Sequence, residues 1–410
     1  MFMSILFYVI LGIIIIQFLI DAIVDYLNAK KFKEAIPQEL DGIFNKEEYI
    51  KSQRYKTANY RFGIFSGSFS VLLTLSFLLF GGFAWVDNFA RSITNNPILI
   101  ATIFFGIIMI GNSILNVPLS YYSTFVIEEK FGFNKTTKKL FFIDLIKSWF
   151  LTAIIGGALL ALVIWFYNWA GTNFWVYAWA VIATISIFMN MFYSKLIVPL
   201  FNKQAPLENG SLKTKIEAYA KKVGFELQNI FIIDGSKRST KANAYFSGFG
   251  KQKRITLYDT LVKDLDEEEI IAVLAHEVGH YKRKHILFNL TASILLTGLT
   301  LYILSIFINT PSISLAIGVT VPSFHAALIG FGILYSPISE ITNLIMNYLS
   351  RKFEYQADDY AKKTYASSPL ITSLKKLSKT SLSNLTPHPA YVFMNYSHPT
   401  LIDRINNLKK

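Results

Sequence analysis

The 410-residue chain contains no cysteine. This absence excludes disulfide bonds, a thiol nucleophile and every zinc site that uses thiolate ligands. Charge is scarce as well, since charged residues make up 16% of the chain, whereas an ordinary soluble domain carries about 25%. A chain that is 52% hydrophobic cannot hide its apolar surface inside one soluble core. The composition therefore predicts an integral membrane protein.

The charge that is present is mostly basic, with a formal net charge of +13. In a soluble protein such an excess favours nucleic acid as a partner. Here the Lys and Arg residues gather beside hydrophobic segments, so we interpret them as determinants of membrane topology that meet anionic lipid. Membrane lipids are expected partners, and nucleic acid is not.

Seven apolar segments are long enough to span a bilayer, which takes about 20 helical residues. They lie at residues 5–23, 62–85, 98–119, 150–167, 174–200, 286–308 and 324–349. The loops between them alternate in charge: the first is rich in Lys and Arg, whereas the second, residues 86–97, has Arg91 alone. Because basic loops stay in the cytoplasm, the alternation predicts an external or lumenal N-terminus and a cytoplasmic C-terminus. The membrane would be a bacterial inner membrane or the endoplasmic reticulum.

The stretch His276-Glu277-Val278-Gly279-His280 lies among apolar residues whose spacing predicts a helix. Residues four apart share one helical face, so the two imidazoles can bind one Zn²⁺ while Glu277 activates a water molecule as general base. This pattern predicts a metal-dependent peptide hydrolase, provided that a third ligand exists and one coordination position stays open.

The third ligand must be His, Asp or Glu, because Cys is absent. We favour Glu354, with Asp358 on the same helical face as the carboxylate that orients a ligand imidazole. His285, Glu340 and Asp359 are alternatives. Of these, His285 is expected at the surface or membrane interface, off the ligand face, and Glu340 falls inside the seventh predicted span.

Residues 202–284 form the main region outside the predicted spans. The patterns predict a helix at 212–223, a strand at 229–233 and a hairpin over 243–257, just before the helix with the two histidines. An edge strand of this hairpin would bind an extended peptide by strand addition, with Asn243 adding side-chain hydrogen bonds. Near the C-terminus, His398 could donate to an oxyanion and Arg404 could orient it or contact the substrate, although a His-Pro pair is also typical of a simple turn.

Beyond the zinc motif, the sequence resembles the type I CAAX prenyl endopeptidases, seven-span zinc metalloproteases of the membrane. The resemblance covers residues 125–147, 201–261, 272–284, 347–359 and 396–404, including DGSKRSTKANAYFSGFG and NYLSRKFEYQADD. It implies a mostly α polytopic fold in which seven transmembrane helices enclose a chamber. A small α+β, zincin-like metalloprotease region would lie on the cytoplasmic side, with its active site facing the chamber.

The resemblance also implies the roles of residues at the metal. His276, His280 and Glu354 would hold one zinc ion per chain, and Glu277 would be the catalytic base. Asp358 would be the carboxylate that supports a ligand imidazole.

Other residues are implied to act on the substrate. Asn243 and Ala244 would bind it on an edge strand, and His398 and Arg404 would stabilise the reaction intermediate. In eukaryotic members of the family the reaction removes the C-terminal tripeptide from a prenylated CAAX protein. A peptide or protein substrate, with or without a lipid, is therefore the expected partner.

We divide the chain into four regions. Residues 1–200 hold five transmembrane helices, 201–285 the zincin-like region, 286–349 two further spans, and 350–410 the third ligand and the residues at the oxyanion. Two alternatives are a membrane quality-control protease, for which four spans are expected, and a transporter or lipid-handling protein with a structural metal, whose site would be closed by four ligands.

Overall fold

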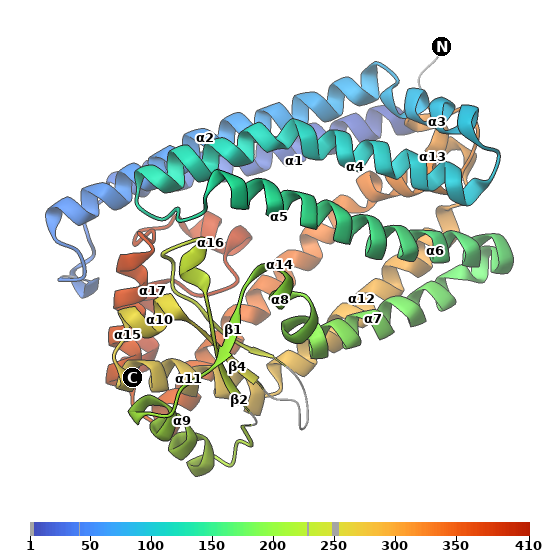
Figure 1. The fold of residues 1–410 in the computed structure, drawn as a ribbon. Coiled ribbons are helices and arrows are strands. Elements are labelled where there is room, and N and C mark those ends of the chain that lie inside the picture. The colour runs from blue at the N-terminus through green and yellow to red at the C-terminus, as the bar shows by residue number, and fades with distance from the viewer. Residues whose placement is uncertain (1–3, 41, 228, 248–253) are drawn as a thin grey trace.

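The computed structural model describes residues 4–40, 42–227, 229–247 and 254–410. Long helices run along most of the molecule, and a smaller region of strands and short helices gathers at one end of them (Figure 1). The long helices are α1 (Ile5–Lys30), α2 (Lys46–Leu79), α4 (Pro97–Tyr122), α5 (Lys138–Leu151), α6 (Gly157–Ala170), α7 (Phe174–Leu196), α12 (His285–Phe307) and α14 (Phe324–Thr364). The protein is thus mostly helical, as the sequence predicts.

Among the described residues, six helical segments are long and apolar enough to cross a membrane. They are Ile5–Lys33, Lys46–Leu79, Pro97–Glu128, Lys138–Phe201, His285–Phe307 and Phe324–Thr364. The fourth and fifth predicted spans both fall inside the 64-residue segment Lys138–Phe201. Within it, a π-helical turn joins α5 to α6, and Gly171, with φ of 57°, lies between α6 and α7, which pack against each other. The count of seven crossings stays a prediction.

The second predicted span, residues 62–85, extends too far. Helix α2 ends at Leu79, because Gly81 takes the left-handed φ of 71° and the chain reverses into α3 (Gly82–Ile93). The loops that the sequence predicts at residues 86–97 and 309–323 also contain short helices, α3 and α13 (Pro311–Ala316). Both are too short to register as apolar spans, and α3 packs against α4 while α13 packs against α14.

The small region is built on a four-stranded sheet with the order β1-β2-β4-β3. Its strands are β1 (Gln204–Pro206), β2 (Asn229–Ile233), β3 (Ala244–Ser247) and β4 (Arg254–Tyr258). Strand β2 coincides with the predicted strand, and β3 pairs antiparallel with β4 as the predicted hairpin requires. The turn of that hairpin, residues 248–253, lies outside the described residues. Strand β1 was not predicted; it is short and pairs antiparallel with β2.

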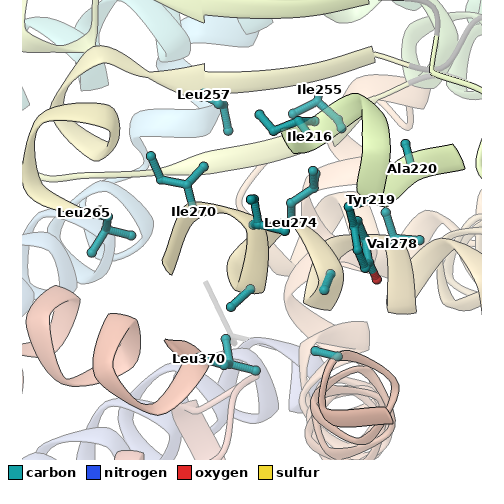
Figure 2. Packing of buried hydrophobic residues seen from close by; sticks show 14 of the residues in the cluster. Ile216, Tyr219, Ala220, Ile255, Leu257, Leu265, Ile270, Leu274, Val278 and Leu370 are labelled. Atoms are coloured by element: carbon teal, nitrogen blue, oxygen red, sulfur yellow. The ribbon is translucent and has the colours of Figure 1, made fainter. Parts of the chain in front are cut away.

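Helix α11 (Glu267–Lys282) carries the two motif histidines through the centre of this region. Asp266 begins it with a capping box, accepting from the Glu269 amide at 3.0 Å. Figure 2 shows Ile270 and Leu274 packed between Leu257 of β4 on one side and Leu370 of α15 (Ser367–Thr380) on the other. Each fully buried Leu or Ile side chain stabilises the fold by roughly 1.5–3 kcal/mol, so this cluster fixes the position of α11.

Helices α11 and α14 approach each other closely at Gly279. A Cβ atom added there would lie 3.0 Å from the Ala357 Cα atom and 3.1 Å from the Tyr360 Cβ atom. The glycine therefore sets the distance between the two helices, and with it the distance between the side chains that they carry.

We expect Gly279→Ala to lower the thermal unfolding midpoint by a few degrees, because overpacking between backbones costs about 1–3 kcal/mol. The measurement is thermal unfolding of purified protein, together with its metal content. Gly332→Ala on α14 is the matched control, since a Cβ there meets nothing within 4 Å. Equal midpoints for the two variants would contradict this account of the contact.

Candidate metal centre

Helices α11 and α14 bring three possible ligands together. His276 and His280 lie one turn apart on α11, with their Nε2 atoms 3.1 Å from each other. Glu354 of α14 faces both: its Oε2 lies 3.5 Å from His276 Nε2, and its Oε1 lies 3.2 Å from His280 Nε2. His276 and Glu354 are buried and His280 is half-buried. In the described part of the chain, these three form the group whose atoms converge closely enough to hold a metal ion.

Asp358 determines which nitrogen of His276 faces the centre. Its Oδ1 lies 2.8 Å from His276 Nδ1, and its side chain is fully buried. Nδ1–H donates to this carboxylate, so Nε2 is the nitrogen left to bind a metal. Burial and the charge of Arg404 lower the pKa of His276, but the hydrogen bonds to Asp358 and Glu354 outweigh them and raise the pKa to about 9. A metal ion bound at Nε2 would displace the proton that this raised pKa holds there.

His280 is oriented by a second chain of contacts. Its Nδ1 lies 3.1 Å from His285 Nδ1, and His285 Nε2 lies 2.9 Å from Gln356 Oε1. When His285 Nε2–H donates to Gln356, His285 Nδ1 accepts from His280 Nδ1–H, and His280 Nε2 is left free. The tautomers of both histidines therefore point a lone pair at the centre.

The expectation of a surface position for His285 is wrong. It is 3% exposed, and its ring stacks on Phe353 with centroids 4.2 Å apart. Lys284 adopts the left-handed φ of 61° and turns the chain so that His285 comes back to His280. Helical spacing alone placed His285 off the ligand face, and a left-handed lysine gives no signal in the sequence. The contribution of Gln356 was not predicted either.

Arg404 locks the supporting carboxylate in place. It extends from α17 (Leu401–Lys409), and its Nε and Nη2 atoms donate to the two oxygens of Asp358 at 2.9 and 2.6 Å. Its Nη1 also lies 3.4 Å from Glu354 Oε2. Burial lowers the pKa of Arg404, but the hydrogen bond and charge of Asp358 raise it in net, so the guanidinium stays charged. Its predicted contact with substrate stays a prediction.

His398 reaches the rim of the same centre. Its Nε2 lies 3.4 Å from Glu354 Oε1, and 63% of its side chain is exposed. The segment before it is held on α14, where Asn347 donates to the Met394 carbonyl at 2.9 Å and Arg351 donates to the Val392 carbonyl at 3.2 Å. His398 is therefore placed where an incoming molecule can meet it.

Glu277 follows His276 directly and is half-buried. Within the residues that the structure describes, its carboxylate forms no ion pair, and its charge contributes to the raised pKa of Arg404. The alternative ligands lie elsewhere: Glu340 is exposed on α14, and Asp359 Oδ1 accepts from Asn407 Nδ2 at 3.1 Å.

Asn243 and Ala244 lie at the sheet edge. Ala244 begins β3, which pairs with β4 on one side, and Asn243 Oδ1 accepts from the Ala244 amide at 2.9 Å. Asn243 and Tyr245 also line a cavity of about 980 Å³ between the sheet, α7 and α12. No contact in the described part of the chain joins this edge to the metal ligands, so its role with substrate stays a prediction.

Comparison with known proteins agrees with this geometry. A family model described as CAAX prenyl protease N-terminal, five membrane helices, matches residues 25–203. The model for peptidase family M48 matches residues 206–410.

Relatives match nearly the whole chain. CAAX prenyl protease 1 homolog from Arabidopsis thaliana is 34% identical over 97% of this chain and 96% of its own. CAAX prenyl protease 1 from Saccharomyces cerevisiae is 35% identical over 98% of this chain and 94% of its own. The crystal structure of S. mikatae Ste24p has a TM-score of 0.95 at 34% identity, covering 99% of this chain and 100% of that one. With a His-His-Glu centre held against membrane helices, the chain therefore belongs to peptidase family M48, as an integral-membrane metallopeptidase of the CAAX prenyl protease type.

Proposed function

We propose that this membrane metallopeptidase binds one Zn²⁺ per chain and cleaves peptide bonds near the C-terminus of CAAX-type proteins. The observation that carries the proposal is the convergence of His276 Nε2, His280 Nε2 and Glu354 on one point. The substrate class rests on the relatives, which are named CAAX prenyl proteases in organisms as different as Arabidopsis thaliana and Homo sapiens.

The donor set fits zinc. Bonds of 2.0–2.1 Å in a tetrahedron place ligand atoms roughly 3.3 Å apart. The two Nε2 atoms lie 3.1 Å apart, and each faces a different oxygen of Glu354, Oε1 at 3.2 Å from His280 and Oε2 at 3.5 Å from His276. Glu354 Oε2 is buried and accepts no hydrogen bond in the described part of the chain; its ion-pair contacts, to Arg404 Nη1 at 3.4 Å and His276 Nε2 at 3.5 Å, are long, so a lone pair is available to a metal ion. Three protein ligands leave the fourth position open for a reactant.

Zinc at this centre would supply a Lewis acid that acidifies water and polarises the scissile carbonyl. Glu277 takes the proton of the attacking water and delivers it to the leaving amine. The exposed imidazole of His398 donates to the oxygen on which negative charge develops. Asp358 and Arg404 keep His276 in the tautomer that the reaction needs.

Substrate binding involves the edge of the sheet. An extended peptide adds to the free side of β3 through main-chain hydrogen bonds, and Asn243 fixes its register. The cavity of about 980 Å³ beside this strand has room for substrate side chains or a lipid. A bound peptide with one end at β3 would present its scissile bond to the metal centre carried by α11 and α14.

The membrane arrangement that we propose has seven crossings around a chamber, with the N-terminus external or lumenal and the active site cytoplasmic. The reversal at Gly171 supports two crossings within the segment Lys138–Phe201. Six apolar segments exceed the four spans expected of the quality-control alternative. A ligand set of three, rather than the four of a structural site, argues against the transporter alternative.

Replacing Glu277 with Gln removes the base and leaves the metal ligands intact. We expect the rate of peptide cleavage to fall by at least about a hundredfold, with zinc content unchanged. The rate is measured on a CAAX-type peptide and the zinc by elemental analysis. Glu217→Gln, an exposed carboxylate on α9 (Ser211–Lys222), is the control. A Glu277→Gln protein as fast as the parent would refute the mechanism.

Glu354→Ala removes a ligand, so both zinc content and activity should fall. Asp359→Asn is the matched control on the same helix and should keep one zinc per chain. Elemental analysis after dialysis against a weak chelator measures both. Full zinc in the Glu354→Ala protein would assign the third ligand elsewhere.

Membrane topology gives an independent test. A reporter fused after Lys410 should read as cytoplasmic, and one inserted within residues 309–323 as external, because the loops alternate in basic charge. The reverse pair of readings would place the active site on the other side of the membrane.

A further inference from the structure

A second cavity, of about 710 Å³, lies at the polar end of α2, away from the metal centre. Five of its lining residues are basic: Lys33, Lys51, Arg54, Arg61 and Lys130. Glu47 is the one acid among the lining residues. All five basic side chains are exposed, and together they give this lining a local excess of positive charge, which attracts anions.

The protein itself does not neutralise these charges. Within the part of the chain that the structure describes, none of the five basic side chains has an ion-pair partner. A neighbouring cavity of about 730 Å³ shares Lys51 but differs in charge: its other lysines are matched by Glu48, Asp259 and Asp264. The excess of positive charge is therefore specific to the cavity of about 710 Å³, which we call the basic cavity.

Three separate segments form the basic cavity. Lys51, Arg54 and Arg61 are spaced to share one face of α2. Lys33 comes from the short helix after α1, and Lys130 from the segment that follows the π-helical end of α4. Next to Lys130, the buried ring of Phe131 packs against Tyr55, with centroids 5.0 Å apart. The basic side chains thus extend from packed elements.

The same face of α2 continues into apolar surface. Phe65 and Leu72 follow Arg61 by four and eleven residues, which keeps them in line with Arg54 and Arg61. Phe65 is 61% exposed and Leu72 is 63% exposed. One stripe of the helix therefore offers two guanidinium groups above two exposed hydrophobic side chains, a match for a molecule with an anionic head and an apolar tail.

We propose that the basic cavity binds the phosphate headgroup of an anionic phospholipid, whose acyl chains lie along Phe65 and Leu72. Arginine forks suit phosphate oxygens, and basic pockets at a membrane edge attract anionic lipid. The apolar stripe favours a membrane lipid over free phosphate. This inference does not depend on the proposed proteolytic function, because none of these residues belongs to the metal centre.

The test uses native mass spectrometry to measure the binding of two lipids to purified full-length protein. The anionic lipid is dioctanoyl phosphatidylglycerol and the comparison is dioctanoyl phosphatidylcholine. We expect the parent to bind the anionic lipid at least about tenfold more tightly. The Arg54→Gln/Arg61→Gln protein should lose this preference. Lys138→Gln/Lys139→Gln, which removes two cations at the start of α5, is the matched control and should keep it.

Four outcomes would overturn the proposal. One is equal binding of the two lipids by the parent protein, and another is an equal loss of preference in both double variants. The third is displacement of the anionic lipid by inorganic phosphate at the same concentration, which would indicate a site for free phosphate. If the Arg54→Gln/Arg61→Gln protein keeps the zinc content and thermal unfolding midpoint of the parent, its loss of lipid binding is not caused by misfolding. Retention of the preference by that protein would also reject the site.

Discussion

The close packing of α11 against α14 is the contact on which the metal centre depends. One helix carries both histidines and the other carries the glutamate, and no loop joins them directly. Gly279 lets the two backbones come within a distance that a Cβ atom would obstruct, and the apolar cluster around Ile270 and Leu274 holds α11 against the sheet at the same time. Three ligand atoms from two helices can then converge without any one of them being strained into place.

Buried charge is the second constraint. Asp358, Arg404 and Glu354 are all taken out of water, which is costly for isolated ions. Each is compensated by another: the guanidinium contacts both carboxylates, and one carboxylate accepts from the His276 ring. Because Arg404 extends from α17, the centre is complete only when this helix has packed. The chemistry therefore depends on the fold of nearly the whole polypeptide.

Much of this arrangement could be predicted from the sequence, since it is carried by local periodicity. Strand β2, the pairing of β3 with β4 and the helical spacing of His276 and His280 follow from residues near one another. The end of α2 could not be predicted, because a glycine inside an apolar run gives no sign of its left-handed backbone. The contact of His285 with His280 was missed for a similar reason. The roles assigned to Asn243, Ala244, His398 and Arg404, and the division into four regions, stay predictions, because they concern a substrate or boundaries that packing alone does not reveal.

Helix α14 runs without a break from Phe324 to Thr364, a length of about 60 Å at 1.5 Å per residue. Its first part is an apolar segment that contains Pro337, and its last turns bear Glu354 and Asp358, so one continuous helix joins the bilayer to the metal centre. Membranes of different thickness change the tilt of such helices. A tilt of α14 that α11 did not follow would change the distances between the three candidate ligands, so this helix connects the metal centre mechanically to the bilayer.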